Sequence, residues 1–303
     1  MTTRGGFTLV EVLVAMVIAL MVGGLVHRQL FYGRRVFQAQ VERTALQDNV
    51  RLAALVLAGE LGAIGYDEIT PEASAALGAP VEARSDLLAL APGAVTYLAA
   101  RGSGQVCGVV PGPAAEIRVR ESSWASLRAP RPTDSLLAFV ESDPAIAADD
   151  AWIHLGVVAV AASSCPGGEA GIAMRVAVPA PLDPWALAAI TPGAPAALAE
   201  VMQIRYYESG GKSWFGLRSV STGEAVTPVA GPLADSTAGV RGLTLRYRGA
   251  TDAETSDPTL VRTVDATLIG VTDQAIHGRD LRRALVDSFA LTTRIALLNA
   301  LRP

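Results

Sequence analysis

The chain has 303 residues, of which 50% are hydrophobic, and its mean hydropathy is +0.35. This value is high for a purely soluble protein and indicates one membrane-embedded segment beside a sizeable folded core. Basic and acidic residues nearly balance, the net charge is −4, and Lys212 is the only lysine. Because no block of like charge is present, we expect no direct nucleic-acid binding.

The first element in chain order is an apolar run from Phe7 to Val26 that contains one charged residue, Glu11. In helical form this run spans about 30 Å, which is enough to cross the hydrocarbon core of a bilayer. A secretory signal peptide would have a shorter apolar run followed by a small-residue cleavage site, and the sequence shows neither. We therefore predict a transmembrane helix over residues 7–26, preceded by a short segment, residues 1–6.

A helical pattern continues beyond Val26, with no proline until Pro71. Charged residues lie between apolar residues that recur at spacings of three and four, which is typical of an amphipathic helix. The apolar positions form two successive stripes, the first at Leu30, Phe37 and Val41 and the second at Leu46, Val50, Ala53, Leu57, Leu61 and Ile64. We expect one helix from Phe7 to about Ile64, whose second half, residues 27–64, packs on a globular domain over residues 65–303.

The stretch RGGFTLVE, from Arg4 to Glu11, resembles the class III signal of type IV prepilins and type II secretion pseudopilins. In that family a dedicated prepilin peptidase cuts after a glycine, and the new N-terminal residue is methylated. The resemblance implies that Gly6 precedes the cut and that Phe7 becomes the methylated first residue of the mature chain. Residues 1–6 would then be a leader peptide. An ordinary single-pass anchor, with Glu11 near one membrane interface, is the alternative.

A carboxylate inside a membrane is costly unless it is paired or protonated, so Glu11 needs a partner. Cleavage would create one, because the free amine of Phe7 carries a positive charge. The resemblance implies that Glu11 pairs with the N-terminal amine of a neighbouring subunit and sets the axial register of a filament. Major pilins often carry a proline in the later part of this span, whereas the span here has no proline but contains Gly23 and Gly24. The two glycines favour either a flexible point or close helix packing.

Beyond Gly65, β-type runs recur between breaks rich in proline and glycine, and several alternate strictly between apolar and polar residues. These runs are residues 86–90, 95–100, 105–110, 115–120, 135–141, 152–160, 171–178, 200–208, 213–220, 242–248, 261–271 and 288–297. Gly210 and Gly211 predict a hairpin turn. The proline- and alanine-rich segment from Pro179 to Leu198 is expected to be a surface excursion or a short helix. The fold class is therefore expected to be α+β, a long helix packed on a largely antiparallel, pilin-like β domain.

The two cysteines, Cys107 and Cys165, lie in the predicted globular part. In an oxidising compartment they could form a disulfide, which in the chain-entropy model would stabilise the fold by about 4 kcal/mol. Two buried free thiols are the alternative.

Candidate chemistry is sparse in the rest of the chain. The three histidines, His27, His154 and His277, are far apart and lack metal-ligand spacing, so we expect no metal, no cofactor and no catalytic residue. Acidic residues gather at 67–72 and 142–150, where solvated loops are a simpler interpretation than a calcium site.

Within the family, the segment ELGAIGYDEI and the last three predicted strands are similar to PilW-type minor pilins and type II secretion pseudopilin J. This resemblance implies a non-catalytic structural and assembly subunit of a type IV pilus or a secretion pseudopilus, of the kind that initiates a filament tip. The alternatives are a competence pseudopilin for DNA uptake and a membrane-anchored enzyme or adhesin that uses a pilin-type anchor.

The partners that the resemblance implies are other pilin or pseudopilin subunits, contacted through the N-terminal helix, together with the prepilin peptidase, the inner-membrane assembly platform and membrane lipid. The implied location is a single pass through the cytoplasmic membrane with the C-terminal domain extracytoplasmic, and later the filament itself.

Overall fold

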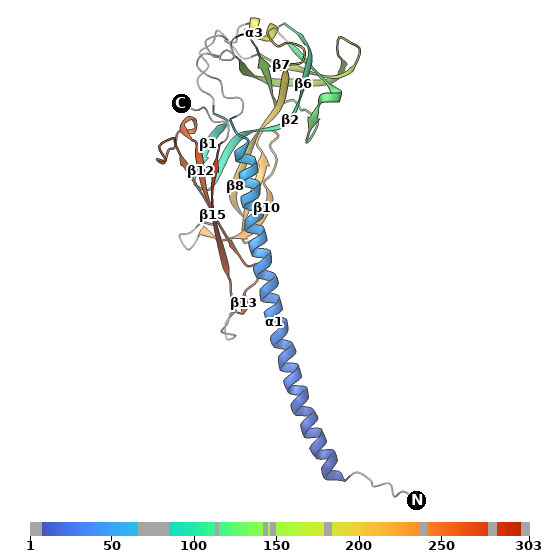
Figure 1. The fold of residues 1–303 in the computed structure, drawn as a ribbon, viewed down its shortest axis with the longest axis vertical. Coiled ribbons are helices and arrows are strands. Elements are labelled where there is room, and N and C mark those ends of the chain that lie inside the picture. Colours follow the sequence, from blue (N-terminus) through green and yellow to red (C-terminus); the bar gives the residue numbers. More distant parts are fainter. Residues whose placement is uncertain are drawn as a thin grey trace, which may run out of the picture.

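The computed structural model describes residues 8–65, 85–112, 115–141, 145, 150–178, 184–236, 241–277 and 284–297. The predicted leader, Phe7, the acidic segment 67–72 and most of the acidic segment 142–150 lie outside the described residues. Figure 1 shows a long helix whose first half projects alone and whose second half enters a β domain. This is the predicted α+β arrangement.

Helix α1 (Leu9–Gly62) closely matches the predicted helix. All six positions of the second apolar stripe are buried, as its spacing requires. The first stripe behaves differently, because Leu30, Phe37 and Val41 are exposed. The expectation that the helix packs on the domain from residue 27 is therefore wrong in its first part. The reason is geometric: no residue of α1 before Ala39 is buried, and Arg35, Phe37 and Gln38 only border an open hollow beside Gln274–Ile276 of the β domain.

The twelve predicted β runs all lie in strands, two of them within the single long strand β2, and every strand pairing is antiparallel. The strands are β1 (Leu87–Ala91), β2 (Ala94–Val110), β3 (Glu116–Arg120), β4 (Ala125–Ser126), β5 (Ser135–Val140), β6 (Ala151–Ser164), β7 (Ala170–Ala177), β8 (Pro195–Ser209), β9 (Lys212–Ser219), β10 (Thr227–Leu233), β11 (Leu243–Arg248), β12 (Thr263–Val271), β13 (Ile276–His277), β14 (Ala284–Leu285) and β15 (Ser288–Ala296). The described residues also form the short helical pieces η1 (Glu121–Ser123), α3 (Pro184–Ala188) and η4 (Pro258–Leu260).

The part of the sheet next to α1, which we call the helix lobe, is built from β1, β9 to β12, β15, the first half of β2 and the second half of β8. Its core joins the buried stripe of α1 to inward-facing strand residues such as Tyr97 and Phe215, both fully buried. Gly270 on β12 lies directly against α1, since a Cβ there would lie 2.5 Å from Val50 and 2.6 Å from Leu46.

A second, distal part of the sheet closes on itself. The order β2–β3–β7–β6–β5–β8 is joined end to end, because β8 also pairs with β2, where Ala199 lies opposite Ala100. These six strands therefore form a small antiparallel barrel, the barrel lobe, with its own core around residues such as Leu136, Met174 and Leu198. Strands β2 and β8 are long enough to belong to both lobes (Figure 1).

In the segment from Pro179 to Leu198, where a surface excursion or a short helix is expected, the described residues 184–198 contain the short helix and are largely buried. The helix is α3, and Leu187 and Ile190 are almost fully buried and pack into the core of the barrel lobe. From Pro195 onward the segment is the start of strand β8. The predicted glycine turn is confirmed, since Gly210 and Gly211 have φ of +61° and +72° and join β8 to β9.

Candidate assembly site

The N-terminus of α1 is closed by a reciprocal pair of hydrogen bonds between Thr8 and Glu11. The Glu11 backbone N–H donates to Thr8 Oγ1 at 3.3 Å, and the Thr8 backbone N–H donates to Glu11 Oε2 at 2.9 Å. This is a capping box, which satisfies two backbone donors that a helix N-terminus otherwise leaves free. The structure thus gives Glu11 a polar partner within its own chain and places it in the first turn.

The helix that follows is long and apolar enough to cross a membrane, and no residue of its most apolar window is buried by the rest of the described chain. Side chains such as Leu13, Ile18 and Leu20 are more than half exposed. An exposed apolar surface of this size is unfavourable in water. In the hydrocarbon core of a bilayer it would contact apolar lipid chains, and the helix would satisfy its own backbone hydrogen bonds. The exposed half of α1 therefore fits a single-pass membrane anchor.

Gly23 and Gly24 lie inside this exposed half, and α1 continues through both without interruption. No atom lies within 4 Å of a Cβ placed at either residue. The two glycines are thus not required by packing within the chain itself, and their role as a flexible point or a packing surface stays a prediction.

A largely buried polar network, which no local sequence pattern predicts, lies where α1 ends and the two lobes meet. Arg101 on β2 donates to Glu60 on α1 at 2.8 Å and to Glu200 on β8 at 3.0 Å. Arg128 donates to the other oxygen of Glu200 at 2.7 Å and to Asp134 at 2.6 Å. The network therefore ties the end of the helix to strands of both lobes.

The environment of this network shifts two pKa values in opposite directions. Burial raises the pKa of Glu200, but hydrogen bonds from Arg128 and Ser219 outweigh it, so the carboxyl has a pKa below its ordinary value. Burial, together with the charge and the hydrogen bond of Glu60, raises the pKa of Tyr97 far above its ordinary value. Glu200 is therefore held ionised and Tyr97 neutral, where its hydroxyl donates to Glu60 at 2.6 Å.

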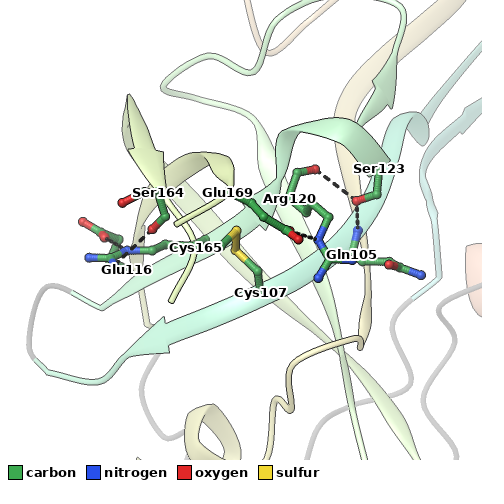
Figure 2. The surroundings of a disulfide bond; sticks show 9 residues. Gln105, Cys107, Glu116, Arg120, Ser123, Ser164, Cys165 and Glu169 are labelled. Carbon is green, nitrogen blue, oxygen red and sulfur yellow. Dashed lines mark hydrogen bonds and ion pairs between the residues drawn. A yellow bond between two sulfur atoms is a disulfide. The ribbon is translucent and has the colours of Figure 1, made fainter. Parts of the chain in front are cut away.

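Cys107 and Cys165 form a disulfide in the barrel lobe, with their Cα atoms 5.6 Å apart (Figure 2). The bond ties the turn between β6 and β7 to strand β2, across the intervening strand β3. Nearby, Arg120 pairs with Glu169 at 2.7 Å, so an ion pair accompanies the covalent link.

Of the three histidines, His27 packs edge-on against Phe31 one turn later on α1, with ring centroids 4.6 Å apart, and His154 lies in β6. The side chain of His277 lies outside the description. Within the described ranges, no group of three or more His, Cys, Asp or Glu residues is placed to hold a metal ion.

A family model described as the prokaryotic N-terminal methylation motif matches residues 1–26. Among curated proteins and solved structures, none matches the chain. The motif indicates a type IV pilin-like protein. The match covers Gly6, Phe7 and Glu11, of which only Glu11 lies among the described residues. Cleavage and methylation at Gly6 and Phe7 therefore stay predictions.

Proposed function

We propose that this chain is a minor pilin or pseudopilin, a non-catalytic structural and assembly subunit similar to the PilW-type minor pilins and pseudopilin J. The observation that carries the proposal is the methylation motif at residues 1–26. It includes the start of a helix that is exposed along its first half and packs one apolar stripe on a β domain along its second. Such a helix can be held in lipid before assembly and against other apolar helices afterwards.

Glu11 has a specific role in this proposal. After removal of residues 1–6, the amine of Phe7 would lie one residue before Thr8, the N-cap of α1. A neighbouring subunit that offers such an amine to Glu11 would neutralise both charges in an apolar setting, and the pair would fix the step between subunits.

Processing is tested by the intact mass of the membrane-extracted protein. The expected mass corresponds to loss of Met1 to Gly6 and addition of one methyl group, and a Gly6→Val variant should keep the full-length mass. An unprocessed chain in cells that process their other prepilins would overturn the proposal.

The role of Glu11 is tested with Glu11→Gln, which keeps the shape of the side chain and removes its charge. Processing and membrane insertion should remain, while incorporation into the filament, measured in sheared filament fractions, should fall at least tenfold. Glu42→Gln, on the same helix beyond the apolar span, is the matched control and should incorporate normally. Equal incorporation of the two variants would refute the pairing role.

Companion genes for a secretin, a pilus or a secretion system would identify the machine that the subunit serves.

A further inference from the structure

The segment of α1 between the apolar span and the β domain carries an unusual set of side chains. Arg28, Arg34 and Arg35 are all exposed, and Phe31 and Tyr32 between them are each half exposed. We refer to these five residues as the arginine collar. Arg28 and Arg35 are seven residues apart and so lie on the same side of the helix, while Arg34 lies about 100° around it.

The three positive charges of the collar have no acidic partner on their own helix. Between Glu11 and Glu42 the sequence contains no aspartate or glutamate, so no pair at i+3 or i+4 can form. Among the described residues, no ion pair or hydrogen bond from the collar arginines is found. The three guanidinium groups are therefore free of competing partners on this helix and open to an anionic partner from outside it.

Two acidic residues of the described chain, at the end of the β domain near the collar, already have cationic partners. Asp287, at the start of β15, accepts a hydrogen bond from Arg43 at 2.8 Å. Asp273, just before β13, pairs with Lys212. Both carboxylates of the described strand ends beside the β13–β14 hairpin thus have cationic partners that are not in the collar.

The position of the collar along the helix matches the headgroup layer of a bilayer. With Val26 at the edge of the hydrocarbon, Arg28 lies about 3 Å and Arg35 about 14 Å beyond it, at 1.5 Å per residue. Side chains on a helix lean toward its N-terminus, here toward the membrane, and an arginine can extend its guanidinium back to the headgroups. Aromatic rings such as Phe31 and Tyr32 are typical of this interface.

We propose that the arginine collar binds the phosphate headgroups of anionic phospholipids and thereby sets the depth of the anchor in the membrane. The guanidinium fork matches phosphate in geometry and charge. This inference rests on the membrane anchor and not on the role of the chain in a filament, so either can fail without the other.

The test uses the full-length chain in neutral detergent micelles, with bound phosphatidylglycerol or phosphatidylcholine counted by native mass spectrometry as lipid is titrated. The natural chain should retain phosphatidylglycerol in preference to phosphatidylcholine. A variant with Arg28→Gln, Arg34→Gln and Arg35→Gln should lose affinity for phosphatidylglycerol about a hundredfold, from about fivefold per arginine. The corresponding triple lysine variant should keep most of the binding, because it keeps the charge.

The matched control replaces three exposed arginines of the β domain, Arg131, Arg175 and Arg246, with glutamine, which removes the same charge elsewhere. It should bind phosphatidylglycerol like the natural chain. Equal retention of phosphatidylglycerol by the collar variant and the natural chain would overturn the proposal. A collar variant that keeps its lipid but no longer enters filaments would overturn it as well, because the arginines would then serve a contact with another subunit.

Discussion

Glu200 is the residue at which the charged side chains of both lobes converge. Its carboxylate accepts hydrogen bonds from Arg101, Arg128 and Ser219, and its side chain is only 8% exposed. A buried ion pair is weak evidence for stability as a whole, but removing one partner leaves the opposite charge uncompensated in a poorly solvated place. The network is therefore a point at which a single substitution should have a large effect.

We predict that Glu200→Gln lowers the free energy of unfolding by about 3 kcal/mol, because two guanidinium groups lose their shared carboxylate. Thermal and denaturant unfolding of the full chain in detergent measures this. Glu224→Gln is the matched control, since Glu224 is 56% exposed and lies 3.8 Å from Arg131. Its effect should not exceed about 0.5 kcal/mol. Equal losses in the two variants would contradict the assigned role of the network.

Asp265 gives a pH dependence with a definite sign. Hydrogen bonds from Arg294 at 2.6 Å and Arg248 at 2.5 Å lower the pKa of Asp265 to about 2, against an opposing contribution from burial. Because the folded pKa lies below the ordinary value of 3.8, the ionised carboxylate stabilises the fold above that value. This stability is lost as the pH falls from about 4 to about 2.

Accordingly, Asp265→Asn should make the melting temperature less dependent on pH over this range, measured in detergent at constant ionic strength. Asp48→Asn serves as the control, because Asp48 is 66% exposed and 3.9 Å from Arg51. In the Asp48 variant, the melting temperature should depend on pH as it does in the natural chain. If the melting temperature of the Asp265 variant depended on pH as strongly as that of the natural chain, the ion pairs of Asp265 would not be the cause of the pH dependence.

At the scale of elements, the close packing of α1 against β12 depends on the absence of a side chain at Gly270. We expect Gly270→Ala to destabilise the protein by about 1–3 kcal/mol, because its Cβ would overlap Val50 and Leu46 of the helix. Gly156→Ala in β6 is the matched control, since the nearest atom to its Cβ lies at 4.0 Å. The free energies of unfolding of both variants test this prediction. If the Gly270 variant were as stable as the natural chain, the helix could shift away from β12 at little cost.

The same elements show how far local sequence predicts this fold. In β12, Val264, Ala266 and Leu268 are fully buried and alternate with less buried neighbours, so the period of two is visible in the sequence. The burial of α3 is not visible, because the prolines around it give the same local signal as a surface loop. Closure of the barrel was also unpredictable, since it depends on β8 pairing with β2 about a hundred residues earlier.

The candidate site also contains one part that can be predicted from local sequence and one part that cannot. The pattern around Gly6, Phe7 and Glu11 is contiguous, so it can be recognised without any knowledge of the fold. The charge network has members as distant as Glu60 and Glu200, each of which looks like an ordinary surface charge in the sequence. Only the three-dimensional pairing shows that the half-buried Glu60 and the buried Glu200 share a partner, Arg101.

At the scale of the whole molecule, the disulfide closes a loop with a sequence separation of 58 within the barrel lobe. We predict that the double variant Cys107→Ser, Cys165→Ser loses about 4 kcal/mol of stability on the chain-entropy model, with 2–4 kcal/mol typical of measured disulfides. Thermal unfolding with and without a strong reductant measures it. The natural chain should be weakened by the reductant and the variant should not respond. An unaffected natural chain would mean that the bond does not constrain the unfolded state.

The ion pair between Arg43 and Asp287 joins residues separated by 244 positions. The helix is synthesised well before β15, one of the strands that flank it. Until synthesis passes residue 296, the apolar stripe from Leu46 to Leu61 lacks part of its cover. A chain that ends before β15 would thus carry the N-terminal motif and the apolar span but an exposed apolar stripe, which proteases can recognise. The core next to α1 is covered only in a chain that extends through β15.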